Sequence, residues 1–152
     1  WVGCCGRGGG AGGGGGAGLH ASLALADTLL VDLPAGEYHT IVGMSGLAGR
    51  ALALCPDGFA EPAIPAAIAA LYASIAVGAG VIGLDVAEKT GFAGNCLAPT
   101  TDTVWMSEAA LAALTAGSRR GFERAGFKVA AVALDEIEKA GGSVRCCIGE
   151  IY

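Results

Sequence analysis

A strand–strand–helix–strand pattern that returns at a nearly fixed spacing constrains this chain more than any other feature. The predicted elements of the first copy are 38–45, 50–56, 61–76 and 80–86. Those of the second copy are 93–99, 102–108, 108–126 and 128–134. A helical turn over 135–142 and a strand over 143–151 lead into a third copy. The copies open near residues 39, 95 and 146, so the period is 56 and then 51 residues. Such self-similarity is typical of propeller-like or pseudo-symmetric arrays.

The order of these elements predicts an α/β fold made of repeated ββαβ units. Two and a half units are too few to close a ring, so we expect only part of an α/β array. Within the second helix, Gly117 is the expected point of a break. Asp135 is the expected N-cap of the helical turn that follows.

The first eighteen residues form a glycine-rich, low-complexity segment, and residues 19–152 carry the folded part. The tract 6–18 cannot pack a core and is predicted to be flexible. It is no phosphate-binding loop, because Leu19 and His20 follow where Gly-Lys-Ser/Thr is required. The chain begins with Trp1 rather than Met, and we expect it to be part of a longer protein.

Charge and hydropathy exclude several classes of partner. The net charge is −5 and no Lys/Arg cluster is present, which argues against nucleic acid and against an anionic membrane surface. The uncharged run 63–84 is long enough for a membrane span. Its alanines and glycines instead favour a helix, a glycine turn and a buried strand.

Cysteine spacing argues against a metal site. The six cysteines are at positions 4, 5, 55, 96, 146 and 147, and none forms a C-x-x-C pair, so we expect no metal. The pattern also differs from that of a small secreted disulfide scaffold. We therefore expect reduced thiols in an intracellular protein, with Cys55 and Cys96 in the core.

A polar residue opens each copy of the repeat: His39, Asn95 and Cys146. If the first strands of the copies line a common channel, these three side chains converge. A histidine beside a cysteine helps to form the thiolate, which is the nucleophile, and later moves protons. The alternative is that both residues are ordinary members of the core.

Four segments carry a resemblance to a known superfamily. In order along the chain they are "EYHTIVGMS", "GFAGNCL", "VWMSEAA" and "EIEKAGGSVRCCIGEIY". They resemble the guanidino-group-modifying enzymes, or penteins, over about residues 36–152. This group includes dimethylarginine dimethylaminohydrolase, arginine deiminase and the citrulline-utilisation hydrolases of the amidinotransferase group, the last of which look most similar.

The resemblance implies a five-bladed α/β propeller, of which this chain would be a C-terminal portion. It implies that Cys146, directly after Arg145, attacks the guanidino or ureido carbon and forms a covalent intermediate. Cys147 would point to the opposite face of the strand. His39 would be the general acid and base, and Asn95 would shape the channel and contact the substrate.

The resemblance is weaker at the start of the chain. "WVGCCGRG" resembles a family segment whose arginine binds the substrate carboxylate, which would be Arg7, although Cys4, Cys5 and Gly8 depart from the pattern. The family's guanidinium-binding carboxylates lie upstream of that arginine, and no acid of this chain matches them. We therefore expect the chain alone to be inactive.

The leading hypothesis from the sequence is a cytoplasmic hydrolase of an arginine derivative: dimethylarginine, arginine or citrulline. It implies a small guanidino or ureido substrate and no cofactor. An amidinotransferase and a non-catalytic, degenerate relative are the alternatives, and a homo-oligomer is left open. A cysteine peptidase lacks a local signature around the thiol.

Overall fold

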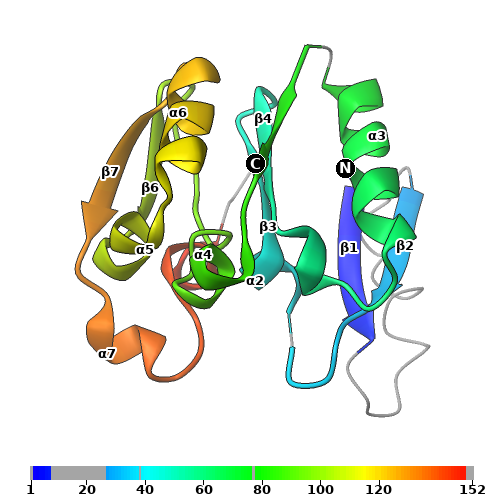
Figure 1. Cartoon of the computed structure of the whole chain (residues 1–152), viewed down its shortest axis with the longest axis horizontal. Helices are drawn as coiled ribbons and strands as arrows, with labels where there is room; N and C mark the ends of the chain where they lie inside the picture. Colours follow the sequence, from blue (N-terminus) through cyan, green and yellow to red (C-terminus); the bar gives the residue numbers. More distant parts are fainter. Residues whose placement is uncertain (1, 8–26, 38, 77, 150–152) are drawn as a thin grey trace.

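Three small β-sheets lie side by side and are separated by helices (Figure 1). The computed structural model describes residues 2–7, 27–37, 39–76 and 78–149. The strand orders within the sheets are β1–β2, β3–β4–β5 and β6–β7. This mixed arrangement of helices and strands confirms the predicted α/β class.

The first sheet pairs β1 (Val2–Arg7) with β2 (Asp27–Asp32) in parallel. A parallel pair requires a crossover connection, since a tight hairpin can join only antiparallel strands. The connection here is 8–26, which lies outside the described residues, as does the predicted glycine-rich tract from residue 8 onward.

The central sheet has the predicted ββαβ order. β3 (Met44–Leu47) and β4 (Ala51–Leu54) are antiparallel, and the turn between them has positive φ angles at Ala48 and Gly49 (48° and 66°). The Arg50 amide donates to the Leu47 carbonyl oxygen at 2.9 Å, which closes a β-turn with these two residues at its centre. The alanine-rich helix α3 (Ala63–Ile75) then crosses over to β5 (Gly80–Gly83), which is parallel to β4.

The third sheet keeps only part of the predicted unit. β6 (Thr103–Ser107) and β7 (Lys128–Val132) are parallel, and α5 (Glu108–Ala113) and α6 (Ala116–Arg124) connect them. The strand predicted over 93–99 was wrong, because only a single bridge, from Leu97 to Trp105, is formed there.

The break predicted at Gly117 was also misplaced. α5 ends at Ala113 with Leu114 as its C-cap, and Thr115 is the N-cap of α6, where its side chain accepts a hydrogen bond from the Ser118 amide. The side chain of an N-cap threonine satisfies an amide that has no partner inside the helix. The break is therefore set by a capping residue, two positions before the glycine.

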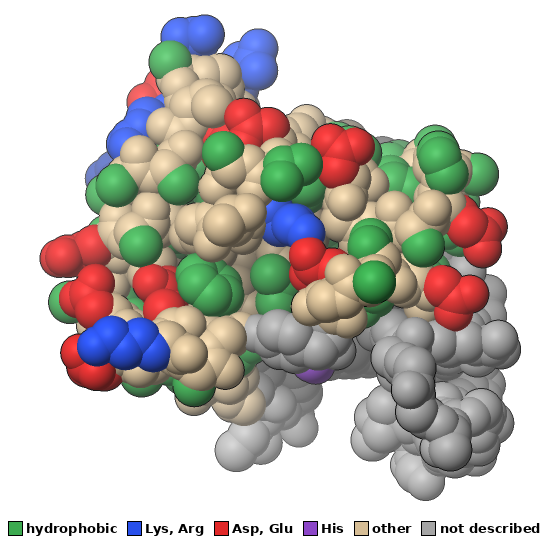
Figure 2. All heavy atoms as spheres, turned by 60° about the horizontal axis from the view of Figure 1, so that its bottom comes forward, with side chains coloured by type: hydrophobic (Ala, Val, Ile, Leu, Met, Phe, Trp, Pro, Cys, Tyr) green, Lys and Arg blue, Asp and Glu red, His purple; other side chains and the backbone are tan. Residues whose placement is uncertain are grey.

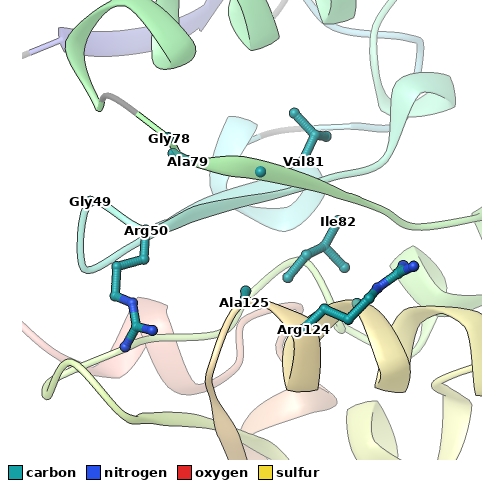
Figure 3. Close-up of a pocket in the computed structure, with 10 residues that line it drawn as sticks. Gly49, Arg50, Gly78, Ala79, Val81, Ile82, Arg124 and Ala125 are labelled. Carbon is teal, nitrogen blue, oxygen red and sulfur yellow. The ribbon is translucent and has the colours of Figure 1, made fainter.

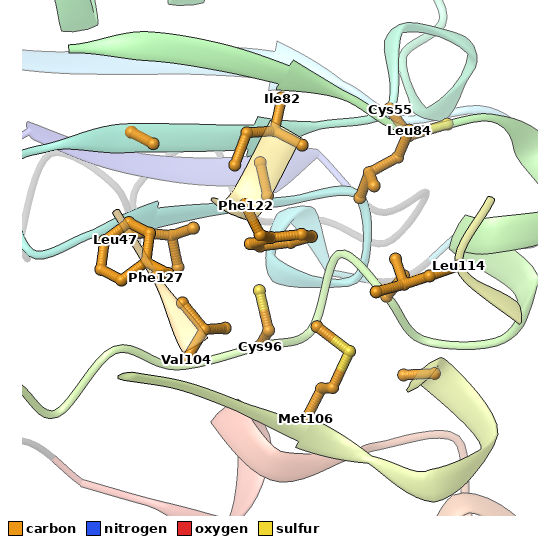
Figure 4. Packing of buried hydrophobic residues seen from close by; sticks show 14 residues of the cluster. Leu47, Cys55, Ile82, Leu84, Cys96, Val104, Met106, Leu114, Phe122 and Phe127 are labelled. Atoms are coloured by element: carbon orange, nitrogen blue, oxygen red, sulfur yellow. The ribbon is translucent and has the colours of Figure 1, made fainter. Parts of the chain in front are cut away.

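Two hydrophobic clusters pack on opposite faces of β4. Alternate residues of a strand point to opposite faces. Accordingly, Ala51 and Ala53 belong to the larger cluster, shown in Figure 4, while Leu52 and Leu54 belong to a smaller one with Phe59. The larger cluster joins the central sheet to α6 and the third sheet through these buried residues: Ile82, Leu84, Val104, Met106, Phe122 and Phe127.

Two segments predicted as strands are helical turns. Thr40–Gly43 forms the short helix α2, with His39 as its N-cap. Val144–Cys147 forms the 3₁₀ turn η2 rather than the strand predicted over 143–151. β-Branched residues favour strands by local propensity, but tertiary contacts override that preference in both places.

The remaining elements are η1 (Pro56–Gly58), α4 (Val86–Thr90) and α7 (Asp135–Glu138). The N-cap of α7 is Leu134, so the prediction that Asp135 caps it was wrong by one residue. The apolar run 63–84 divides into α3 and β5, as predicted. Within the described ranges, no helix is long and apolar enough to cross a membrane.

Candidate active site

The thiol of Cys146 is exposed at the end of η2 and is held by a buried amide. Asn95 Nδ2 donates a hydrogen bond to Cys146 Sγ at 3.1 Å. The backbone amide of Cys146 donates to the Ser143 carbonyl oxygen at 3.0 Å and, at 3.4 Å, to Asn95 Oδ1. Cys146 is thus an exposed residue whose sulfur and backbone amide both bond to Asn95.

Asn95 connects this thiol to the segment that carries His39. The residue is fully buried, and its Nδ2 also donates to the Ile41 carbonyl oxygen at 3.0 Å. Its Oδ1 accepts from the Arg145 amide at 3.1 Å. One side chain thus bonds both to η2 and to α2, although these segments lie about fifty residues on either side of it in the sequence.

His39 is exposed at the start of α2. Its Nδ1 accepts a hydrogen bond from the Ile41 amide at 3.4 Å, which satisfies one of the free amides at the helix start. The carbonyl of the same Ile41 is the acceptor for Asn95. The structure therefore places the imidazole two residues from the backbone group that Asn95 binds.

Two glycines allow the close approaches in this site. A Cβ at Gly142 would lie 3.1 Å from Cys146 Cβ and 3.5 Å from its Sγ. A Cβ at Gly94 would overlap the carbonyl oxygen of Val42 in α2. Gly141 has a φ of 91°, a conformation that favours glycine. The glycines of "FAGN" and "AGGS" thus bring backbone segments together around the thiol.

Side chains outside the thiol's contacts anchor the two segments that meet here. Ser143 is fully buried, and its hydroxyl donates to Glu138 Oε1 at 2.7 Å, which ties η2 to α7. Lys89 of α4 is mostly buried and forms an ion pair with Glu37, two residues before His39. Neither anchor was predicted from the sequence. The capping box of Asp85 and Glu88, which begins α4, is a sequence signal for the helix that carries Lys89.

Cys146 and Cys147 are both exposed, so they do not divide between two faces of a strand as predicted. Successive residues in a 3₁₀ turn are about 120° apart around the axis. Of the two, Cys146 receives the hydrogen bond from Asn95. Arg7 ends β1, where its register partner is Asp32, and nothing is described of its side chain.

The other two described thiols belong to the core, as predicted. Cys55 and Cys96 are fully buried. Burial raises the pKa of the Cys55 thiol above its usual value, and raises that of Cys96 to about 12. Among the residues that the structure describes, no group of three or more His, Cys, Asp or Glu side chains is placed to hold a metal ion.

The hollow of about 570 Å³ shown in Figure 3 lies elsewhere, between β5 and α6. Its charged lining residues are Arg50 and Arg124, whose side chains point in different directions in that view. Arg50 already donates to the Thr101 carbonyl and lies over the Phe127 ring, 5.3 Å from its centroid. This hollow therefore offers no convergent set of groups comparable to the one around Cys146.

Figure 2 turns the lower side of the molecule in Figure 1, with α2, α4 and α7, toward the viewer. Acidic side chains are spread over this face. Lys and Arg side chains gather mainly at one corner of that face. Together with the net charge of −5, this distribution favours the approach of a cation over that of an anion.

Comparison with protein families gives a match over most of the chain. A family described as "N,N dimethylarginine dimethylhydrolase, eukaryotic" matches residues 36–152, which include His39, Asn95 and Cys146. No curated protein sequence matches the chain significantly.

Solved structures share the fold. The N-terminal domain of ArgZ, a cyanobacterial arginine dihydrolase crystallised as a cysteine-to-serine mutant with substrate, matches with a TM-score of 0.74 at 20% identity. That match covers 93% of this chain and 48% of the ArgZ domain. Unliganded AgrE matches with a TM-score of 0.65 at 22% identity, over 85% of this chain and 18% of its own.

An amidinotransferase has a similar fold. SxtG, from the saxitoxin biosynthetic pathway of Microseira wollei, matches with a TM-score of 0.59 at 12% identity. The match covers 86% of this chain and 38% of SxtG. The chain thus spans about half or less of the length of each of these three structures.

Proposed function

Because this chain belongs to the N,N dimethylarginine dimethylhydrolase family of the pentein superfamily, we propose that it acts on the guanidino or ureido group of an arginine derivative. Cys146 is the proposed nucleophile and His39 the proposed general acid and base. The observation that carries the proposal is the exposed Cys146 thiol, which Asn95 holds while also binding the turn that His39 begins.

The proposed chemistry has two displacement steps. The Cys146 thiolate attacks the planar guanidino carbon, and the new S–C bond replaces a C–N bond. His39 gives a proton to the nitrogen that leaves, so an amine or ammonia departs. His39 then takes a proton from water as its oxygen bonds to the carbon, and the S–C bond breaks to return the thiolate.

Two further assignments complete the proposal. Arg7 binds the substrate carboxylate, from its position at the end of β1. The ββαβ units form part of a five-bladed α/β propeller. The ββαβ order of the central sheet, the parallel pair β6–β7 after it and the parallel pair β1–β2 before it support this architecture.

Amidino transfer is the second candidate, and the similarity to SxtG favours it. An acceptor amine would then replace water in the second displacement, with the same residues in the same roles. The two reactions differ only in what intercepts the intermediate on Cys146, so an added acceptor amine distinguishes them by its product.

Covalent labelling tests the nucleophile directly. The chain is incubated with 2-chloroacetamidine, an amidine that alkylates a thiolate, and the modified peptide is identified by mass spectrometry. We expect one adduct, on Cys146, lost in Cys146→Ser and kept in Cys147→Ser. We expect His39→Ala to slow adduct formation, because the imidazole helps to form the thiolate. Labelling of Cys147 in the Cys146→Ser variant at the wild-type rate would refute the assignment.

Turnover is measured separately, as release of ammonia or amine from arginine, dimethylarginine and citrulline. We expect release only if acids of this chain, such as Asp32 or Glu37, hold the cationic guanidinium against the thiol. Release by the purified chain would show that acids within it, such as Asp32 or Glu37, supply that role.

A further inference from the structure

The side-chain amide of Asn95 is fully occupied by the protein. Its two N–H groups point at Cys146 Sγ and at the Ile41 carbonyl oxygen, at 3.1 and 3.0 Å. Its oxygen accepts from the amides of Arg145 and Cys146, at 3.1 and 3.4 Å. With both protons and both lone pairs used, and with no exposed surface, the amide has nothing left to offer a substrate.

The four contacts also fix which way the amide faces. Two backbone N–H groups point at one end of the amide, so that end must be the oxygen. The nitrogen must then face the Cys146 sulfur and the Ile41 carbonyl oxygen. Turning the amide over would lose the hydrogen bonds at both of its ends. The thiol therefore always has a hydrogen-bond donor in front of it.

We propose that Asn95 is a positioning residue for Cys146 and not a substrate-binding residue. Its N–H stabilises the thiolate form of the sulfur, since a donor binds an anionic acceptor more strongly than a neutral one. Its second N–H holds the turn that begins at His39, so the same amide sets the place of the sulfur relative to that turn. The inference rests on the proposed function in taking Cys146 as the nucleophile.

The neighbouring thiol provides an internal control. Cys147 is exposed on the same turn and receives no bond from Asn95, so both thiols meet the same reagent under the same conditions. The measured quantity is the ratio of the iodoacetamide alkylation rates of Cys146 and Cys147 at a fixed pH near 8, from peptide mass spectrometry.

Asn95→Asp is the main variant, because it keeps the oxygen that accepts from the two backbone amides and removes the donor to sulfur. We expect the ratio to fall by about three- to tenfold. In general, a hydrogen bond to a charged atom is worth more than tenfold in an equilibrium constant. The greater intrinsic nucleophilicity of a thiolate without that bond offsets about half of this on a logarithmic scale.

Ser143→Ala is the matched control. It removes the bond to Glu138 that anchors the same turn and leaves every Asn95 contact in place. We expect it to change the two rates together, with a ratio within about twofold of the wild type. An equal fall of the ratio in both variants would mean that loosening of the turn, not loss of the donor, is responsible, and would overturn the proposal.

A measurement on the unsubstituted residue keeps the test decisive if Asn95→Asp does not fold. The side-chain amide protons of Asn95 are followed by NMR in the wild type, Cys146→Ser and Cys147→Ser. We expect them to shift as the thiols ionise in the wild type and in Cys147→Ser, and to stay unchanged in Cys146→Ser. Unchanged shifts in the wild type would refute the hydrogen bond.

The two proposals can fail separately. Alkylation and NMR need no substrate, so a changed ratio without 2-chloroacetamidine labelling of Cys146 would leave Asn95 as its positioning residue and reject the enzymatic role. Labelling of Cys146 by 2-chloroacetamidine with an unchanged alkylation ratio in Asn95→Asp would support the enzymatic role and reject Asn95 as a positioning residue.

Discussion

Single cysteines differ in this molecule because of what surrounds them. Cys96 and Cys146 are both next to Asn95. Asn95 directly precedes Cys96 in the sequence, and its side chain binds the thiol of Cys146. Cys96 nevertheless lies in the hydrophobic cluster, whereas Cys146 is exposed. The same functional group is thus kept neutral in one place and available for reaction in the other.

The buried thiol predicts a loss of stability in alkali. Burial raises the pKa of Cys96 to about 12, from its usual value of 9.0. The neutral thiol therefore favours the folded state fully below pH 9, and its contribution is lost as the pH rises from 9 towards 12. The full contribution corresponds to about 4 kcal/mol at 1.36 kcal/mol per pKa unit.

The measurement is the free energy of unfolding in urea at pH 8 and pH 10.5, for the wild type and for Cys96→Ala. We expect the wild type to lose about 1–2 kcal/mol more than the variant over this interval, because only the wild type can ionise this thiol on unfolding. Equal losses would show that Cys96 does not titrate on unfolding.

At the scale of elements, the turn that holds Asn95 is packed directly against α2. The Ser45 hydroxyl donates to the Gly94 carbonyl oxygen at 2.8 Å, and Gly94 itself faces the backbone of Val42. A side chain at this position has to push the turn and the helix apart. The packing of two backbone segments thus depends on one missing Cβ.

We therefore expect Gly94→Ala to destabilise the fold by about 1–3 kcal/mol, the usual cost of overpacking. It should also lower the 2-chloroacetamidine labelling rate of Cys146, because Asn95 moves with the turn. Gly83→Ala in β5 is the control, since a Cβ there meets nothing within 4 Å. Thermal unfolding and labelling of both variants check this. A Gly94→Ala protein as stable and reactive as Gly83→Ala would contradict it.

Local sequence patterns predicted the regular elements well and the site's turns poorly. α3, β4, β5, β6 and β7 lie where periodicity and glycine punctuation placed them. The segments at His39 and Cys146 looked like strands because they are rich in β-branched and apolar residues. Their turns depend on Asn95, a partner remote in sequence, and on close approaches at Gly94 and Gly142.

The spacing of the repeat nevertheless pointed to residues that the structure connects. His39, Asn95 and Cys146 were singled out because each opens a copy, and the structure connects Cys146 and the turn of His39 through Asn95. The expected reason was a channel lined by strands. The observed link is a buried amide, whose bonds cannot be read from one sequence because they depend on how two distant turns meet.

At the scale of the whole molecule, β4 belongs to both hydrophobic clusters. Its odd-numbered residues pack toward α6 and the third sheet, and its even-numbered residues pack toward α3. Unfolding of β4 from one cluster would also expose the apolar residues of the other cluster. We therefore expect the clusters to unfold together rather than one after the other.

Leu52→Ala tests this expectation from the smaller cluster. Leu52 is 1% exposed, and we expect its truncation to cost about 2–5 kcal/mol. In a Trp1→Phe background, Trp105 is the only tryptophan and lies on β6, in the third sheet. Circular dichroism and Trp105 fluorescence should shift to the same lower urea midpoint.

Ile75→Ala is the surface control, because Ile75 is 59% exposed, and it should change stability by no more than about 0.5 kcal/mol. If the Trp105 transition stays at its original midpoint while circular dichroism moves in Leu52→Ala, the two clusters are independent.

The reaction rates of the two fully buried thiols also report how often two parts of the molecule open. Cys55 follows β4 and Cys96 lies in the turn beside Asn95, and a bulky thiol reagent can reach either one only during an opening event. If Cys96 reacts faster than Cys55, the turn that contains Asn95 and Cys96 opens locally while the central sheet stays folded. Equal reaction rates would mean that the reagent reaches Cys96 only when the central sheet opens.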